Sequence, residues 1–376
     1  MDDLQARLEE YFKWFHRHPE LGNQEYGTTA KIRAVLESLG IELLESGLKT
    51  GLAALIPGKA PSAGPLTALR ADIDALPVED ASGVEWASEN PGVSHACGHD
   101  FHITALLGAA VILRENPPEA GSVLLLFQPA EEGGDGAKQV LETGILDKVS
   151  EIYALHVDPS LKSGVIGIMP GAAWSAVGEF RIKLTGKGGH AGRPHLCCDP
   201  VAAAAAFINS AQTVVSRSAD PFDSMVVSIT RCEAGSTWNI IPAAALLEGT
   251  IRAKKTDGLE WAARRLEEIC GGTALASGVK HDFSWVYHTA AVNNDTELCQ
   301  KAAATAGRLG FIVKEASPTM AGEDFAFYQQ RIPGLIFTFG IDGGADEILL
   351  HSPFFAANPS GLSRASNLLA SLAVSA

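Results

Sequence analysis

Four short apolar runs, each about the length of one strand, constrain the fold of this chain more than any other feature. They lie at residues 66–69, 123–127, 152–155 and 335–339, and helical segments separate them. Short runs of β-forming residues that alternate with helices are typical of the buried central strands of an α/β sheet. The sequence therefore predicts an α/β fold for the outer parts of the chain.

The middle of the chain has a different pattern. Residues 179–184 alternate in polarity, Asp199-Pro200 opens a helix as N-cap and first-turn residue, and two strands follow. A second helix is predicted from 257 to 270, ending at Gly271-Gly272. This βαββαβ-like order predicts a small α+β domain at about 177–288, and 376 residues suffice for two domains.

The composition excludes several classes of partner. The formal net charge is −15 and no basic run is present, which disfavours nucleic acid, because its phosphates need clustered Lys and Arg. The longest wholly apolar run, 201–208, is far shorter than the roughly 20 residues of a membrane span. The N-terminus lacks the features of a secretory signal, and the six cysteines suggest no disulfide framework. We therefore expect a soluble cytoplasmic protein with reduced thiols and no membrane partner.

Residues of the kinds that bind metals follow the four predicted strands. In chain order they are Asp72 and Asp74, the pair Glu131-Glu132, His156, and His351. Open α/β sheets bind ligands at the carboxyl edge of their strands, so residues far apart in sequence can share one site there. This pattern predicts that these side chains converge.

The segment HACGHD at 95–100 adds Cys97 and His99, whose thiolate and imidazole are typical zinc ligands. Each residue alone has a plainer interpretation. A single cysteine is more often a small buried hydrophobe, His156 a hydrogen-bonded core histidine, and Glu131-Glu132 a solvated loop. Cys97 as a nucleophile is a further alternative, but it leaves the glutamate pair without a role. The joint pattern favours a metal site.

Ten motifs in a fixed order carry a resemblance to a known family. Together they resemble the aminoacylase-type metallopeptidase family, in the branch of hippurate hydrolase, auxin-conjugate amidohydrolase and bacterial N-acyl-amino-acid amidohydrolases. The resemblance covers nearly the whole chain. The motifs are RHPELGNQE (17–25), RADIDALPV (70–78), HACGHDFH (95–102), FQPAEEG (127–133), ALHV (154–157), GKGGHAGRPH (186–195), NIIP (239–242), GTIR (249–252), AGEDF (321–325) and HSPFF (351–355).

The resemblance implies a discontinuous catalytic domain at 1–176 and 289–376, with a mixed sheet between helices and a dinuclear metal site. It also implies an inserted lid and dimerisation domain at 177–288, and hence a homodimer or dimer-based oligomer. The implied ions are two divalent cations per chain, zinc or manganese first, with cobalt or nickel also open. The implied roles are metal ligand for Cys97, His99, Glu132, His156 and His351, general base for Glu131, oxyanion stabilisation across the dimer for His190, and carboxylate binding for Asn239 and Arg252.

The activity implied is hydrolysis of N-acyl amino acids, such as N-acetyl or N-benzoyl compounds, to a carboxylic acid and a free amino acid. An aminopeptidase or dipeptidase, and a catalytically silent binding protein on the same fold, are the alternatives. Two departures from the family pattern matter. Arg70-Ala71-Asp72 stands where the wider family has His-x-Asp, and arginine cannot ligate a metal. Cys197-Cys198 stands where the branch often has a glycine, which puts the loop after His195 in doubt.

Overall fold

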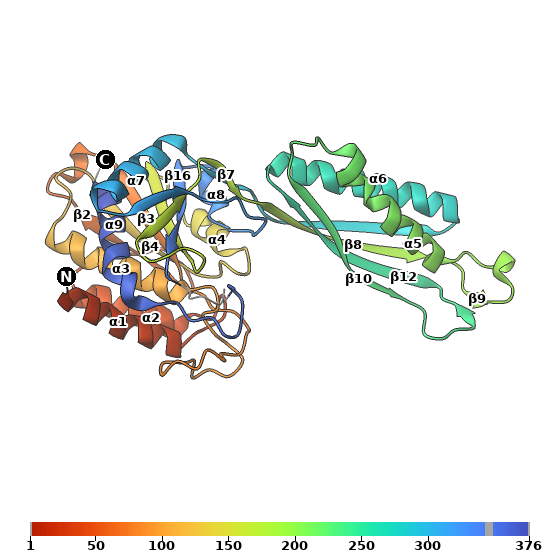
Figure 1. Ribbon diagram of the computed structural model, residues 1–376, viewed down its shortest axis with the longest axis horizontal. Helices are drawn as coiled ribbons and strands as arrows, with labels where there is room; N and C mark the ends of the chain where they lie inside the picture. Colours follow the sequence, from red (N-terminus) through yellow and green to blue (C-terminus); the bar gives the residue numbers. More distant parts are fainter. Residues whose placement is uncertain (1, 343–348, 375–376) are drawn as a thin grey trace. The chain divides into compact units, whose positions relative to one another are not determined.

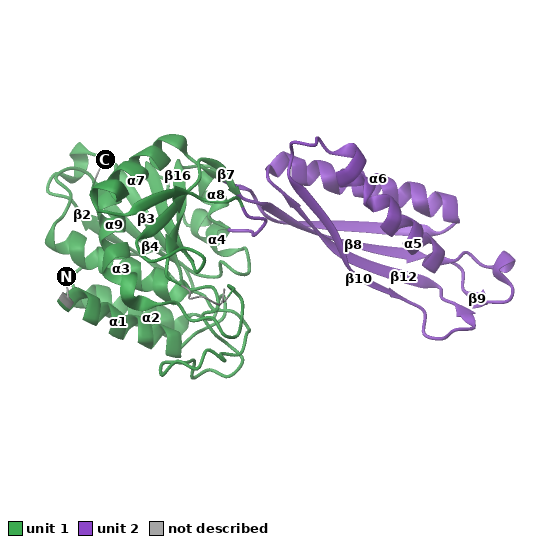
Figure 2. Ribbon diagram, viewed as in Figure 1, with its two compact units in different colours: residues 1–173, 293–318, 324–376 green, residues 174–292, 319–323 purple. Residues whose placement is uncertain are grey.

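The computed structural model describes residues 2–342 and 349–374 and divides the chain into two compact units (Figures 1 and 2). Unit 1 comprises residues 1–173, 293–318 and 324–376, and unit 2 comprises 174–292 and 319–323. In the part of the chain that the structure describes, no helix combines the length and apolarity that crossing a membrane requires.

Unit 1 is built on an eight-stranded mixed sheet in the order β1-β2-β4-β3-β5-β16-β6-β15. The four central strands, β4, β3, β5 and β16, run parallel, and they are the four apolar runs of the sequence. The strands are β1 (Glu42–Leu44), β2 (Leu52–Pro57), β3 (Leu66–Asp72), β4 (Ser122–Gln128), β5 (Glu151–Asp158), β6 (Val165–Ile168), β15 (Ile312–Glu315) and β16 (Gly334–Gly340). The expected α/β fold with a mixed sheet is therefore confirmed.

Helices pack on this sheet through apolar faces. On α1, Leu8, Phe12 and Phe15 recur at helical spacing and are fully buried, each contributing about 1.5–3 kcal/mol by leaving water. Helix α3 packs between α1 and α9 and against β3. The helices are α1 (Asp2–Arg17), α2 (Tyr26–Ser38), α3 (His99–Glu115), α4 (Gly136–Glu142), α7 (Thr296–Arg308), α8 (Ala326–Gln329) and α9 (Leu362–Val374).

Unit 2 contains a four-stranded antiparallel sheet in the order β10-β12-β8-β13, with α5 and α6 packed on one face (Figure 1). Along β8, Phe180, Ile182 and Leu184 are buried against these helices. The elements are β8 (Ala176–Thr185), β9 (Gly189–His190), α5 (Pro200–Ala211), β10 (Met225–Ala234), β11 (Ile240–Ile241), β12 (Ala244–Ala253), α6 (Thr256–Ser277) and β13 (Lys280–Thr289). Two further strands, β7 (Gly171–Trp174) and β14 (Val292–Asn294), pair with each other.

The predicted end of the second helix in unit 2 is wrong. Helix α6 continues through Gly271-Gly272 to Ser277 and ends at Gly278, whose φ of 67° is left-handed. Two glycines cost a helix about 1 kcal/mol each relative to alanine. Here Cys270 and Ala274, on either side of them, are both buried in the core of unit 2, so packing outweighs that cost.

Candidate metal centre

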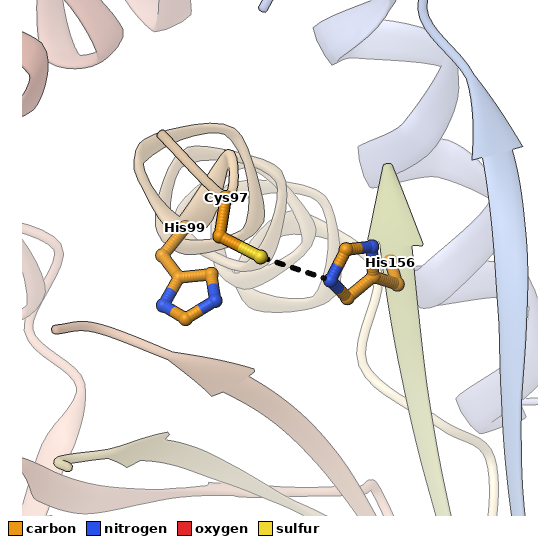
Figure 3. Close-up of side chains that lie close together, drawn as sticks. All are labelled: Cys97, His99 and His156. Atoms are coloured by element: carbon orange, nitrogen blue, oxygen red, sulfur yellow. Dashed lines mark hydrogen bonds between the residues drawn. The ribbon is translucent and has the colours of Figure 1, made fainter. Parts of the chain in front are cut away.

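A glycine turn at the start of α3 directs two candidate ligands to one place. Cys97 precedes Gly98, and His99 is the first residue of the helix. Gly98 has a φ of 84°, and a Cβ at this position would lie 2.4 Å from Cγ2 of Val157. Any other residue would be strained and would also clash with β5. The turn therefore fixes Cys97 and His99 against the strand that carries His156 (Figure 3).

His99 and His156 each have the same ring nitrogen, Nε2, available for a metal ion. Nδ1 of His99 lies 2.9 Å from the carbonyl oxygen of Asp74, and Nδ1 of His156 lies 2.8 Å from that of Val157. A carbonyl can only accept, so in the neutral form of each ring Nδ1 carries the proton and Nε2 has the free lone pair. Nε2 of His156 lies 3.5 Å from Sγ of Cys97. Such backing of a histidine by a carbonyl is the usual support of a metal ligand.

The turn after β4 brings the two glutamates to the same place. The backbone N–H of Glu132 donates to Oδ2 of Asp74 at 3.0 Å. Oε1 of Glu132 then lies 3.9 Å from Nε2 of His99 and 3.5 Å from Nε2 of His351. The backbone N–H of His351 donates to the carbonyl of Ala96 at 2.8 Å, which ties this distant residue to the HACGHD segment.

The structure thus brings all six candidate residues of unit 1 into overlapping groups. In each group the ligand atoms lie within 4.8 Å of one another, and three residues, Cys97, His99 and Glu132, are each shared between two groups. The groups are Cys97, His99 and His156; Cys97, Glu132 and His351; and His99, Glu131 and Glu132. Overlapping groups of thiol, imidazole and carboxylate suit two neighbouring ions bound through S, N and O.

The electrostatics of the cluster also fit cations. Nε2 of His99 and Oε1 of Glu132 are buried and have no hydrogen-bond partner among the described residues. Burial raises the pKa of Glu132 to about 7, and burial together with the charge of Glu132 raises the pKa of the Cys97 thiol. Burial alone would lower the pKa of His99, but the charge of Asp72 and the bond to Asp74 raise it. Without cations this cluster therefore retains protons, and bound cations would favour the thiolate and carboxylate forms.

Arg70, the departure from the His-x-Asp pattern named above, forms a buried ion-pair network. Its side chain is fully buried and donates to Asp72 at 2.7 Å, to Asp324 at 3.0 Å and to Oε1 of Gln128 at 2.8 Å. Asp324, from the AGEDF motif, also accepts the backbone N–H of Ala137 at 2.8 Å. The guanidinium thus compensates the charge of two buried carboxylates.

His102 was missed by the sequence analysis. It lies three residues after His99, on the same side of α3, and its Nδ1 is 2.6 Å from Oδ1 of Asp72. Burial lowers its pKa to about 4, so the ring is neutral at pH 7. The i, i+3 spacing of His99 and His102 in HACGHDFH was a signal that could have revealed it.

A second buried histidine, His16, forms an ion pair with the first turn of α3. Nδ1 of His16, at the end of α1, lies 2.6 Å from Oδ2 of Asp100, and its Nε2 lies 3.3 Å from Oδ2 of Asp80. Burial opposes protonation of His16, but the two carboxylates outweigh it and raise its pKa to about 9. His16 therefore crosslinks α1, α3 and the loop between β3 and α3 as a cation.

Of the three candidate residues in unit 2, the structure brings two together. His190 in β9 pairs with Ile240 in β11, and the backbone N–H of Ala191 donates to the carbonyl of Asn239 at 3.1 Å. Arg252 lies elsewhere, near the far end of β12. From Ala244, close to β11, to Arg252 the strand rises about 26 Å over eight residue steps. Within one chain, Asn239 and Arg252 therefore cannot hold the same carboxylate.

The local surroundings of His190 and Arg252 leave both side chains available to contact a substrate. Nδ1 of His190 accepts the backbone N–H of Gly192 at 2.9 Å, so a neutral ring carries its proton on the exposed Nε2. Arg252 is half-buried, burial alone lowers its pKa, and it forms no ion pair within residues 2–342 and 349–374. The Cys197-Cys198 departure is accommodated, because Cys198 pairs through both backbone groups with Lys187.

Comparison with known proteins supports the same chemistry. Residues 68–375 match the model of peptidase family M20/M25/M40. An N-acetylcysteine deacetylase of Bacillus subtilis is 42% identical over 361 residues, covering 96% of this chain and 94% of the relative. An IAA-amino acid hydrolase of Arabidopsis thaliana is 38% identical over 385 residues, covering 98% and 87%.

The fold agrees with a solved structure as well. The crystal structure of a dinuclear metal-binding peptidase of the M20 family from Bacillus subtilis is similar over 100% of this chain and 98% of that chain, with a TM-score of 0.88 and 38% identity. The resemblance identified from the ten motifs is therefore confirmed. This chain belongs to peptidase family M20/M25/M40 and is a hydrolase of its amidohydrolase branch.

Proposed function

We propose that this protein hydrolyses the amide bond of N-acyl amino acids to a carboxylic acid and a free amino acid. One observation carries the proposal: the buried side chains of Cys97, His99 and His156 lie together with the carboxylate of Glu132 and the more exposed His351, and a second glutamate, Glu131, lies beside them. The deacetylase and hydrolase activities named for its relatives support the same substrate class. A location in the cytoplasm remains part of the proposal.

The ligands we assign are Cys97, His99, Glu132, His156 and His351, holding two divalent ions, zinc or manganese first. When bound, such ions lower the pKa of a coordinated water and polarise the amide carbonyl. Glu132 is the ligand of the glutamate pair, because its carboxylate lies close to both His99 and His351. Oε1 of Glu131, in contrast, accepts the backbone N–H of Asp324 at 3.4 Å.

Glu131 is the general base in this proposal. Its carboxylate takes a proton from the attacking water, whose oxygen bonds to the amide carbon. The same carboxylate then delivers that proton to the amide nitrogen as the carbon–nitrogen bond breaks, which releases the amine. His190, with its proton on Nε2, donates a hydrogen bond to the oxygen that becomes negative.

Arg252 is assigned to the substrate carboxylate, because its planar guanidinium binds a carboxylate bidentately and it has no ion-pair partner among the described residues. A hydrogen bond to a charged group contributes roughly 1.5–3 kcal/mol. Arg252→Ala is therefore expected to lower kcat/KM for an N-acyl amino acid by about ten- to hundredfold. The measurement compares wild type and variant on the acid and on its carboxamide. Equal rates of wild type on both compounds would contradict recognition of a carboxylate.

His190 and Asn239 are proposed to act from a second copy of the chain. They lie together at one end of unit 2, whereas Arg252 lies near the other end of β12. If all three contact one substrate, two chains must contribute, which supports a homodimer with shared active sites.

Subunit complementation tests this arrangement. His190→Ala and Glu131→Gln, each inactive alone, are expected to regain activity when mixed, because a hybrid dimer has one site with both intact residues. The measurement is amide hydrolysis after subunit exchange, with hybrid formation verified by native mass spectrometry. Proven hybrids that stay inactive would place His190 in its own subunit's site.

The substrate class is tested by a direct screen. N-acetyl, N-benzoyl and indole-acetyl amino acids are compared with free dipeptides of the same amino acids. We expect the N-acyl compounds to be hydrolysed and the dipeptides to be poor substrates. Preference for dipeptides would favour the aminopeptidase or dipeptidase alternative instead.

A further inference from the structure

Strands β3 and β5 separate at the metal cluster, and one imidazole lies between them. Their pairing extends from Thr67 opposite Glu151 to Arg70 opposite Ala154 and goes no further. Beyond that point, His102 of α3 connects them through both ring nitrogens. Nδ1 lies 2.6 Å from Oδ1 of Asp72 at the end of β3, and Nε2 accepts the backbone N–H of Val157 in β5 at 2.9 Å.

These contacts fix the chemical state of His102. A backbone N–H can only donate, so Nε2 of His102 is the unprotonated nitrogen. Nδ1 therefore carries the proton and donates a hydrogen bond to Asp72. Asp72 is held in turn by Arg70 at 2.7 Å. Asp72, His99 and His102 also lie close enough together to resemble a metal group. Ligation by His102 would leave the buried N–H of Val157 without an acceptor, at a cost of about 1–3 kcal/mol.

We infer that His102 is a positioning residue that sets the orientation of His156, and not a metal ligand. Val157 links the two histidines, because its N–H donates a hydrogen bond to His102 while its carbonyl accepts a hydrogen bond from Nδ1 of His156. His102 thus fixes the peptide unit that leads into Val157, and His156 is oriented by the carbonyl of the same residue. The RADID segment then organises the ligands without supplying one. This inference rests on the proposed metal role of Cys97, His99 and His156.

Two near-isosteric substitutions separate the two bonds of His102. In His102→Gln, the side-chain oxygen lies near the former Nε2 and can accept the N–H of Val157. In His102→Asn, the amide lies near the former Nδ1 and can donate to Asp72 but cannot reach Val157. His102→Ala removes both. Each variant is purified metal-free and titrated with Co²⁺ alone, and the thiolate-to-cobalt absorption band of Cys97 and the number of bound ions are recorded.

All variants are expected to bind the same number of ions as wild type at saturation. The cobalt affinity should fall by about 10- to 100-fold in His102→Asn and His102→Ala, the range typical of lost support for a metal ligand, and stay near wild type in His102→Gln. Loss of one ion from both His102→Gln and His102→Asn would identify His102 as a ligand. Equal affinities of those two variants, or unchanged binding by His102→Ala, would also overturn the inference. Wild type that binds no cobalt would instead remove the proposed metal centre.

Discussion

Exchange of Glu131 for glutamine is expected to lower kcat by about 10²- to 10⁴-fold, because it removes the carboxylate that moves the proton but keeps the shape of the side chain. Metal content should not change, since the ligand of the glutamate pair is Glu132, which lies close to His99 and His351. The measurement is steady-state hydrolysis of an N-acyl amino acid beside elemental analysis of the same preparation.

Glu132→Gln is the matched control, because it makes the same chemical change one residue away. It should lower metal affinity, and added metal ions should restore part of the lost activity. If Glu131→Gln lost its metals while Glu132→Gln kept them and lost only turnover, the two roles would be reversed.

Replacing Arg70 by methionine is expected to lower the free energy of unfolding of unit 1 by about 3–5 kcal/mol, the usual effect of breaking a buried ion pair. The fully buried guanidinium faces both Asp72 and Asp324, so the variant removes the cation that these two buried carboxylates share. Methionine retains most of the volume, which limits the contribution of a cavity. Urea unfolding of the metal-free protein measures the effect, with hydrogen exchange of β3 and β4 peptides to report unit 1 separately.

Arg265→Met is the control for the loss of an arginine. Arg265 pairs with Glu268 at 2.7 Å on the surface of α6, where both side chains are largely exposed. Such pairs contribute about 0–1 kcal/mol, so the control should unfold close to wild type. Equal stability of Arg70→Met and Arg265→Met would contradict the structural role given to Arg70.

The central strands were predictable because each is a buried apolar run of strand length. Their carboxyl ends meet at one edge, so residues next to β3, β4 and β5 could be expected to converge before any contact was known. The direction of pairing was not predictable in the same way. Strand β2 runs antiparallel to β4, and nothing in the apolarity of Leu52–Pro57 distinguishes that arrangement from a parallel one.

The candidate ligands were predictable from side-chain chemistry, but their supports were not. His102 acts through the main-chain N–H of Val157, which every residue except proline offers, so no side chain marks the contact in the sequence. Arg70 finds Asp324 only after 254 residues of chain. Asn239 and Arg252 lie close in sequence, yet β12 carries them to opposite regions of unit 2, because an extended strand separates its ends by about 3.3 Å per residue.

Amide hydrolysis by this protein is expected to require metal ions held by the cluster of Cys97, His99, Glu132, His156 and His351. The most direct test strips the metals with a chelator, returns divalent ions in steps, and measures kcat/KM for an N-acyl amino acid against the number of ions bound per chain. We predict no activity in the metal-free protein and a rise to full activity as two ions bind. Full activity in a preparation shown by elemental analysis to be free of metal would contradict a metal-dependent mechanism.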